Sequence, residues 1–320
     1  MSIEEAVQQQ LNETVEGTDF PEIGEKYQGK VRDVYQADDK LVIVTTDRVS
    51  AFDHVLGTIP FKGQILNAIA AYGFEQTKDI APNHVVTIPD PNILVGQKAK
   101  PYAVEFIVRG YITGSLWRDY QSGKAAAYGI DFGSDLKKDQ AFPSPIMTPS
   151  TKAELGMHDE PISKPEIVSR GLMTQAQLDE AEDIALKLYA RGVELAAKQG
   201  LILVDTKYEM GLDHDGKLTI IDEIHTPDSS RFWITEEYEK RFAAGESQAM
   251  LDKENLRQWL IETHGFSGEG TPPPLDDKIR IQLACKYAEL YQRLTGTAFE
   301  PTLGDPSARM RENLKKANLI

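Results

Sequence analysis

Residues 201–233 read LILVDTKYEMGLDHDGKLTIIDEIHTPDSSRFW, and this stretch decides the fold. Two apolar runs within it, residues 201–204 and 218–221, have the composition of β-strands. Between them, residues 214–217 read HDGK, and an Asp-Gly pair favours a tight reversal of the chain. The stretch therefore predicts a β-hairpin in which the two apolar runs pair.

Acidic residues follow each apolar run: Asp205 and Glu209 after the first, Asp222 and Glu223 after the second. Pairing of the strands would gather these carboxylates, and buried like charges without a partner are costly. A hard divalent ion such as Mg²⁺ is the expected partner, and Lys207, which lies among the acids, can hold a phosphate. The alternative is an ordinary hairpin whose acids are solvated.

The segment that ends the stretch, residues 225–233, combines a turn, hydroxyl groups, an acid and an arginine. Arg231 follows Asp228 and Ser229, and an arginine among small polar residues suits forked recognition of a phosphate or a carboxylate. The segment therefore predicts an anion-binding site. The competing interpretation is that the Ser-Ser-Arg sequence only caps the next helix.

Composition limits the class of protein. The chain has 320 residues, enough for two domains or for one large α/β body with a lobe, and its net charge of −15 opposes general attraction to nucleic acid or to an anionic membrane. No apolar run approaches the length of a membrane span, and the acidic N-terminus has no apolar signal region, so we expect a soluble cytoplasmic protein. The single cysteine, Cys285, excludes an intramolecular disulfide and is expected to pack in the core.

Known metal and nucleotide motifs are missing from the sequence. The six histidines form no HExxH pattern, and neither GxxxxGK[ST] nor GxGxxG occurs. A nucleotide would therefore have to be bound by another architecture. The sequence leaves the oligomeric state open, and a monomer is the simplest expectation.

The N-terminal part predicts a second antiparallel hairpin. Residues 27–35 alternate as a strand, residues 37–40 turn, and residues 41–45 resume as a strand. Gly29 would let the backbone approach a ligand, and Lys30 and Arg32 would project from one face, where phosphates could lie. The alternative is an exposed edge strand on which both cations only aid solubility.

A strongly apolar strand at residues 101–108 runs into Arg109 and a loop with Gly110, Gly114 and Ser115. We expect this strand to cross from one lobe into the other, and the loop to wrap an anion at the start of a helix. The alternative is that Arg109 pairs with an acid of the core. Residues 125–149 look irregular, and residues 149–160 predict a long polar loop of the kind that is often functional.

Several helices are expected elsewhere. One begins near Ile65, one begins at a capping box at Thr174 and ends at Gly200, and one spans the apolar positions between Ile279 and Leu294. The tail from Thr297 is expected to form a terminal helix.

Six ordered motifs identify a resemblance: GKVRDVY, TTDRVSAFD, VRGYITGSLW, PSTKAELGMHDE, LVDTKYEMG and DEIHTPDSSRFW. Together they resemble the phosphoribosylaminoimidazole-succinocarboxamide synthase (SAICAR synthase) family, and the chain's length resembles its longer, fungal-like branch. The resemblance implies an α+β, two-lobed fold related to ATP-grasp enzymes, with antiparallel sheets and a nucleotide cleft between the lobes. Residues 1–108 would form the nucleotide-covering lobe and residues 109–320 the larger lobe with the metal and substrate site.

The resemblance also implies an activity and its residues. ATP would drive the joining of L-aspartate to carboxyaminoimidazole ribotide, giving SAICAR, ADP and phosphate, most simply through an acyl phosphate. Glu209 and Asp222 match the Mg²⁺ carboxylates, and Lys207 should lie along the nucleotide. The remaining residues match positions around the nucleotide (Gly29, Lys30, Arg32 and Glu105) and around the ribotide or aspartate (Arg109, Ser115, Lys152, Asp228, Ser229 and Arg231, with the loop 150–154).

Two other functions fit the same residues. A small-molecule kinase would use the same metal and ATP to phosphorylate a hydroxyl group, and a non-catalytic nucleotide-binding module would bind ATP without turnover. Product analysis separates these functions from a ligase.

Overall fold

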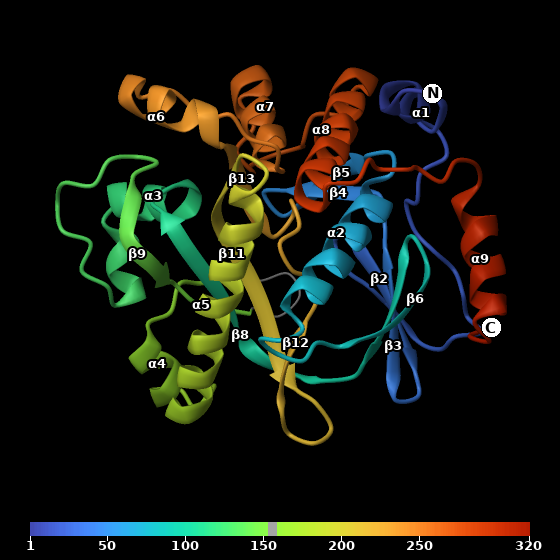
Figure 1. The fold of residues 1–320 in the computed structure, drawn as a ribbon, viewed down its shortest axis with the longest axis horizontal. Coiled ribbons are helices and arrows are strands. Elements are labelled where there is room, and N and C mark those ends of the chain that lie inside the picture. Colours follow the sequence, from blue (N-terminus) through green and yellow to red (C-terminus); the bar gives the residue numbers. More distant parts are fainter. Residues whose placement is uncertain (153–158) are drawn as a thin grey trace.

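The computed structural model describes residues 1–152 and 159–320, and it contains two larger antiparallel sheets (Figure 1). The first sheet has the strand order β1-β2-β3-β7-β6. Its strands are β1 (Lys26–Gln28), β2 (Arg32–Ala37), β3 (Lys40–Thr45), β6 (Val85–Asp90) and β7 (Ile93–Gln97). A separate two-stranded sheet pairs β4 (Arg48–Ala51) with β5 (His54–Thr58).

The second sheet is built around one long strand, β11 (Leu201–Leu212), which pairs with three others. The sheet order is β10-β8-β11-β12, with β13 also on β11 and β9 also on β8. These strands are β8 (Lys100–Tyr111), β9 (Ala141–Met147), β10 (Ser150–Thr151), β12 (Leu218–Ile221) and β13 (Ser230–Ile234). The antiparallel α+β, two-lobed class expected from the sequence is confirmed.

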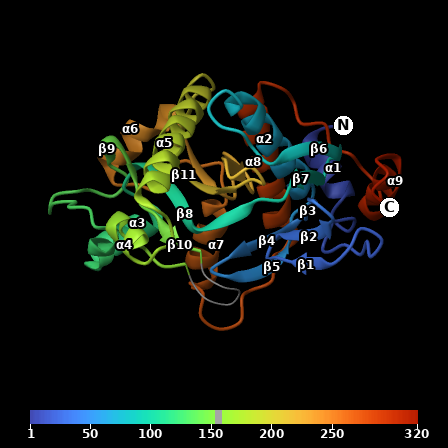
Figure 2. The same cartoon turned by 90° about the horizontal axis from the view of Figure 1, so that it is seen from below.

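Helices cover both sheets. They are α1 (Ile3–Gln9), α2 (Lys62–Thr77), α3 (Gly114–Gln121), α4 (Lys164–Ser169), α5 (Gln175–Ala197), α6 (Thr235–Ala244), α7 (Glu254–His264), α8 (Asp277–Thr295) and α9 (Pro306–Lys316), with a 3-10 helix η1 (Lys124–Tyr128). Helix α5 packs across β8 and β11 (Figure 2), and the capping box at Thr174 forms as expected. No helix in the described ranges is both long and apolar enough to span a bilayer.

The central hairpin exists, but its register differs from the prediction. Residues 218–221 pair with residues 209–212 of β11, whereas the apolar run at 201–204 pairs with β13. The prediction that the two apolar runs pair is therefore wrong. The reversal at residues 213–217 fixes this register, because a tight turn joins only the residues that flank it directly. Strand β11 continues through its acids instead of ending before them.

The N-terminal hairpin is also partly corrected. Residues 27–35 do not form one strand, because β1 ends at Gln28 and β2 begins at Arg32. The Gly29 N–H donates to the Arg32 carbonyl at 2.8 Å and closes a turn between them. Lys30 therefore lies at the tip of a loop, and only Arg32 belongs to a strand. Pairing of β2 with β3 is as expected.

The C-terminus returns to the first sheet. Met310 and Leu314 of α9 join an apolar cluster with Val42, Val44 and Val95 of that sheet, so the expected terminal helix is packed rather than frayed. The change from the first sheet to the second falls at residues 98–99, ahead of β8, which lies wholly in the second sheet. The division into lobes at residues 108 and 109 stays a prediction.

The predictions for residues 125–149 and for Cys285 need correction. The stretch 125–149 is not wholly irregular, since it holds most of η1 and all of β9. Cys285 on α8 is only partly buried rather than a full core residue, and burial raises the pKa of its thiol.

Candidate active site

The polar side chains of β11 occupy one face of that strand. Asp205, Lys207 and Glu209 alternate with Tyr208 and Met210, which are fully buried in the core. Because successive residues of a strand point to opposite faces, the three charged groups share one side. We call this side the cleft face.

Strand register supplies the partners of these groups. On β8, Arg109 lies opposite Asp205 and Glu105 lies opposite Glu209, while on β13 Arg231 lies opposite Asp205. Directly opposed side chains on neighbouring strands contact one another. The pairing therefore separates the cleft face into an acidic end at Glu209 and an arginine-rich end at Asp205.

At the acidic end, lysines bridge the carboxylates. The Lys207 Nζ lies 2.8 Å from Glu105 and 2.7 Å from Glu209, and Lys152 forms a second ion pair with Glu209. Burial would raise the pKa of Glu209, but the positive charges of Lys207 and Lys152 prevail and lower it to about 2. Glu209 is therefore ionised at neutral pH.

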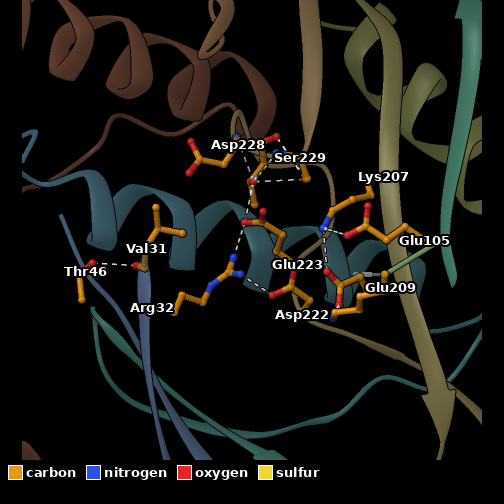
Figure 3. A network of polar contacts seen from close by, with 12 residues as sticks. Val31, Arg32, Thr46, Glu105, Lys207, Glu209, Asp222, Glu223, Asp228 and Ser229 are labelled. Atoms are coloured by element: carbon orange, nitrogen blue, oxygen red, sulfur yellow. Dashed lines mark hydrogen bonds and ion pairs between the residues drawn. The ribbon is translucent and has the colours of Figure 1, made fainter. Parts of the chain in front are cut away.

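Asp222 reaches the same end from the other strand. Ile221 pairs with Glu209, so Asp222 follows directly beyond β12, in a left-handed backbone conformation with φ of 69°. Arg32 forms ion pairs with Asp222 and, at 2.5 Å, with Glu223 (Figure 3). Arg32 is largely buried between these acids, so the edge-strand alternative is wrong for this residue.

The acidic end suits a hard cation. Among the described residues it combines four carboxylates (Glu105, Glu209, Asp222 and Glu223) with three cations (Arg32, Lys152 and Lys207). Carboxylate oxygens are preferred Mg²⁺ ligands, and Mg²⁺ in nucleotide sites needs only one or two of them beside the phosphates. Glu209 on β11 and Asp222, which directly follows the neighbouring strand β12, fit that role.

A second group of acidic residues lies outside the cleft face. Asp213, His214 and Asp215 are the one trio, in the part of the chain that the structure describes, whose ligand atoms all lie within 4.8 Å of one another. They occupy the hairpin turn, where the side chains of His214 and Asp215 are exposed. Because of this exposure, the trio is not assigned to the site.

The loop at Gly29 is held by an arginine that sequence analysis left without a role. Arg48 donates from Nε to the Lys30 carbonyl and from Nη2 to the Gly29 carbonyl, each at 3.0 Å. The same guanidinium pairs with buried Asp33 at 2.8 Å. A buried, fully bonded arginine thus fixes the loop's backbone, while the Lys30 side chain pairs with Asp53.

The arginine-rich end has one shared acid. Asp205 accepts from Arg231 at 2.7 Å and from Arg109 at 3.1 Å, and Arg109 also donates to Ser115 at 3.4 Å. Arg109 thus does pair with a core acid, as the alternative held, yet it also lines a cavity of about 180 Å³ together with Ser115, Ser229 and Arg231. Gly114 has a left-handed φ of 56°, and a Cβ there would come within 2.4 Å of the Arg231 guanidinium, so a larger residue would strain the backbone and displace Arg231.

Asp228 also lines this cavity, but its oxygens already have partners. Lys62, whose side chain is fully buried, lies 2.8 Å from Oδ2, and the Tyr287 hydroxyl donates to Oδ1 at 3.2 Å. Burial would raise the pKa of Asp228, but nearby Lys253 and Lys62 lower it. Asp228 therefore holds its turn in place. The Ser229 carbonyl also accepts a hydrogen bond from the Lys207 N–H at 2.9 Å, which attaches the turn to β11.

Sequence analysis missed several residues of the site. Lys62, Lys253, Arg257 and Tyr287 come from helical regions that carry no motif beyond their apolar periodicity. The one available signal was the position of Lys62 in the loop after TTDRVSAFD, directly before an apolar helix.

The expected roles of Glu105 and of the loop at residues 150–154 stay predictions. The backbone of Glu105 is paired on both sides, with Ser150 of β10 and Glu209 of β11, and its side chain turns to Lys207, so contact with adenine stays a prediction. Of the expected loop 150–154, residues 153 and 154 lie outside the described residues.

His225 shapes the turn that carries Asp228. It has a left-handed φ of 54°, and its Nε2 is hydrogen-bonded to the Tyr208 hydroxyl at 2.7 Å. The ring packs so closely on α5 that a Cβ at Gly192 would lie within 2.6 Å of it. Burial lowers the pKa of His225 to about 3, so the imidazole is neutral.

This buried histidine predicts a loss of stability in acid. The unfolded chain binds the proton near pH 6.5 and the folded protein only near pH 3, so stability falls as pH drops through this window. Asparagine tolerates the same left-handed backbone conformation. Between pH 7.5 and pH 5, we expect the free energy of unfolding of His225→Asn to fall by about 2 kcal/mol less than that of the wild type. Urea unfolding at both pH values measures this, and identical losses would contradict it.

Comparisons with known proteins come from sequence and from structure. Residues 25–272 match the family model described as SAICAR synthetase. A phosphoribosylaminoimidazole-succinocarboxamide synthase of Legionella pneumophila is 45% identical over 92% of this chain and 95% of its own length. One of Cytophaga hutchinsonii is 48% identical over 91% and 94%.

Solved structures show the same similarity. A SAICAR synthase of Saccharomyces cerevisiae complexed with SAICAR has a TM-score of 0.79, with 32% identity over 90% of this chain and all of that chain. A type-2 SAICAR synthetase in complex with ADP has a TM-score of 0.67, with 26% identity over 87% of this chain and all of that one.

Proposed function

The chain belongs to the SAICAR synthetase family, and from that premise we propose that it joins L-aspartate to the carboxylate of carboxyaminoimidazole ribotide. ATP would drive the reaction, which gives SAICAR, ADP and phosphate in purine biosynthesis. The observation that carries the proposal is the cleft face, which separates an acidic end from an arginine-rich end along one strand. An ATP-dependent ligase needs both ends, for metal-bound phosphates and for an anionic substrate.

The nucleotide would lie between the two sheets at the acidic end. The Gly29 loop, with Lys30 and Arg32, would cover its phosphates, and Lys207 would lie alongside them. The attachment of this loop through Arg48 supports the assignment, because it fixes the loop's backbone next to the start of the strand that carries Arg32. Glu105 would lie toward the adenine in this proposal.

Glu209 and Asp222 would hold Mg²⁺, which supplies charge neutralisation to the phosphates when bound. The chain's own residues do the rest by positioning. Lys207 pairs with Glu209 and Arg32 pairs with Asp222, which supports a position for both cations beside the terminal phosphate. Their positive charges would stabilise the charge that spreads over that group during transfer.

The proposed chemistry has two balanced steps. A carboxylate oxygen of the ribotide attacks the γ-phosphorus and ADP leaves, which forms an acyl phosphate. The aspartate amine then attacks the acyl carbon, phosphate leaves, and the amine loses a proton. Little covalent work falls to the protein, and the two substrates must be held in contact away from water.

The ribotide would lie at the arginine-rich end, with its phosphate on Arg109, Ser115 and Arg231 and with Lys152 at the border. We expect Arg231→Ala to weaken the apparent binding of ribotide by about 2–5 kcal/mol, because the arginine lies in a largely desolvated site. The measurement is the ribotide KM, with Arg241→Ala on α6 as a control. An unchanged ribotide KM would remove Arg231 from the site.

The experiment that tests the function is product analysis. Purified protein is incubated with ATP, Mg²⁺, ribotide and L-aspartate, and each component is omitted in turn. The proposal expects ADP, phosphate and SAICAR in equal amounts, only when all components are present. ADP formation without ribotide and aspartate, or a stable phosphorylated product, would indicate a kinase, and ATP binding without turnover would indicate a binding module.

The proposal also includes a cytoplasmic location and a monomeric state. One cysteine in 320 residues fits a reducing compartment. Light scattering of the purified protein measures the mass directly, and a mass of twice 35.7 kDa would replace the monomer with a dimer.

A further inference from the structure

The cations of the cleft differ in one respect, which is whether a carboxylate of the protein already binds them. Most have such a partner within hydrogen-bonding distance: Arg32, Lys62, Arg109, Lys152, Lys207, Arg231 and Arg257. Lys253 is the exception among cations lining the 180 Å³ cavity. Its nearest acid within the described ranges is Asp228, at 3.9 Å, and no hydrogen bond of its side chain occurs there.

The charges around Asp228 leave one positive charge in excess. Lys62 and Lys253 both approach its Oδ2, at 2.8 Å and 3.9 Å, and the shorter ion pair belongs to Lys62. The other oxygen accepts from Tyr287. One carboxylate thus faces two ammonium groups in a largely buried place, where an ammonium group without a hydrogen-bonded acceptor is costly. An incoming anion would remove that cost.

The position of Lys253 also favours an anion. It precedes α7, and its backbone N–H donates to the Pro227 carbonyl at 3.3 Å, which holds the start of the helix against the turn of Asp228. The Lys253 side chain is 15% exposed and lines the cavity beside Lys207 and Ser229, between the two ends of the cleft face.

We infer that Lys253 receives a carboxylate of L-aspartate and so determines which amine the enzyme accepts. The inference rests on the proposed function and completes it. The ribotide phosphate already has Arg109, Ser115 and Arg231, and the ribotide carboxylate is the reacting group, so two carboxylates of aspartate still need cations. Among the described residues that line the cavity, Lys253 is the cation with no carboxylate closer than 3.9 Å.

The test compares Lys253→Met, Lys253→Arg and a control on an exposed lysine, Lys240→Met, by steady-state kinetics. We expect Lys253→Met to raise the aspartate KM about 10–100-fold, the range for loss of one charge-assisted contact, and to leave the KM values for ATP and ribotide within about twofold. Lys253→Arg should recover part of the loss. An unchanged aspartate KM, or an equal rise in the ribotide KM, overturns the inference.

A second nucleophile separates this inference from the proposed function. Hydroxylamine can attack an acyl phosphate to give a hydroxamate and phosphate, and it carries no carboxylate. In Lys253→Met, ribotide-dependent ADP release with hydroxylamine should match the wild type while aspartate use falls. Equal loss of both reactions means that Lys253 has a structural role. Failure of the wild type to release ADP with ribotide and either nucleophile would instead overturn the proposed function.

Discussion

Asp222→Asn and Glu209→Gln are each expected to lower ligase turnover by about three orders of magnitude, because each removes one of two carboxylates from the proposed Mg²⁺ site. The fold should persist. In Asp222→Asn, Arg32 keeps its ion pair with Glu223, and in Glu209→Gln, Lys207 keeps its ion pair with Glu105. The measurement is ADP release as a function of Mg²⁺ concentration, with circular dichroism to verify folding.

The matched control is Asp215→Asn, which removes a carboxylate from the same hairpin at its exposed turn. Its turnover should equal that of the wild type. Higher Mg²⁺ should rescue part of the activity of the two site variants, since weaker metal binding is the stated cause. Turnover within about tenfold of the wild type for both variants at every Mg²⁺ concentration would exclude Glu209 and Asp222 as the metal ligands.

Lys62→Met is expected to reduce the free energy of unfolding by about 3–5 kcal/mol, because it removes one partner of a buried ion pair and leaves the charge of Asp228 poorly compensated. Methionine fills a similar volume without the ammonium group. The side chains of Lys62 and Asp228 are 0% and 5% exposed, so water cannot replace the lost partner. Lys253, at 3.9 Å, compensates only in part. Urea unfolding measures the change.

The control lies at the other end of the same helix. Lys78 pairs with Glu75 in solvent, with side chains 65% and 63% exposed, and Lys78→Met should change stability by less than about 1 kcal/mol. The double variant Lys62→Met/Asp228→Asn should be less destabilised than the sum of its single variants, since neither charge is then left alone. If the losses in free energy of unfolding were additive, the interaction between Lys62 and Asp228 would not contribute to stability.

Much of the site was accessible from local sequence. The Asp-Gly reversal returned the chain so that Asp222 came near Glu209, whereas the shared face of Asp205, Lys207 and Glu209 emerged only because β11 continues through them in the structure. The reversal needs only the geometry of a tight turn. The order of the six motifs then indicated the family, which the comparisons confirm.

Other parts depended on contacts between distant segments. The register of β8 and β13 against β11 decides that Arg109 and Arg231 share Asp205, and no local pattern contains that register. The bulge between Leu203 and Asp205 also involves a distant segment, since the Tyr189 hydroxyl of α5 lies 2.7 Å from the Leu203 carbonyl and 3.1 Å from the Val204 carbonyl.

By itself, the sequence determined the fold class, the family and the existence of the hairpin, because these follow from strand composition, turn chemistry and motif order. Only the tertiary structure decided which charges are paired and which are not. It buried Lys62 against Asp228 from a helix more than a hundred residues away, and it left Lys253 facing the cavity. Charge pairing depends on distances between segments that are remote in the chain, and a linear pattern does not contain those distances.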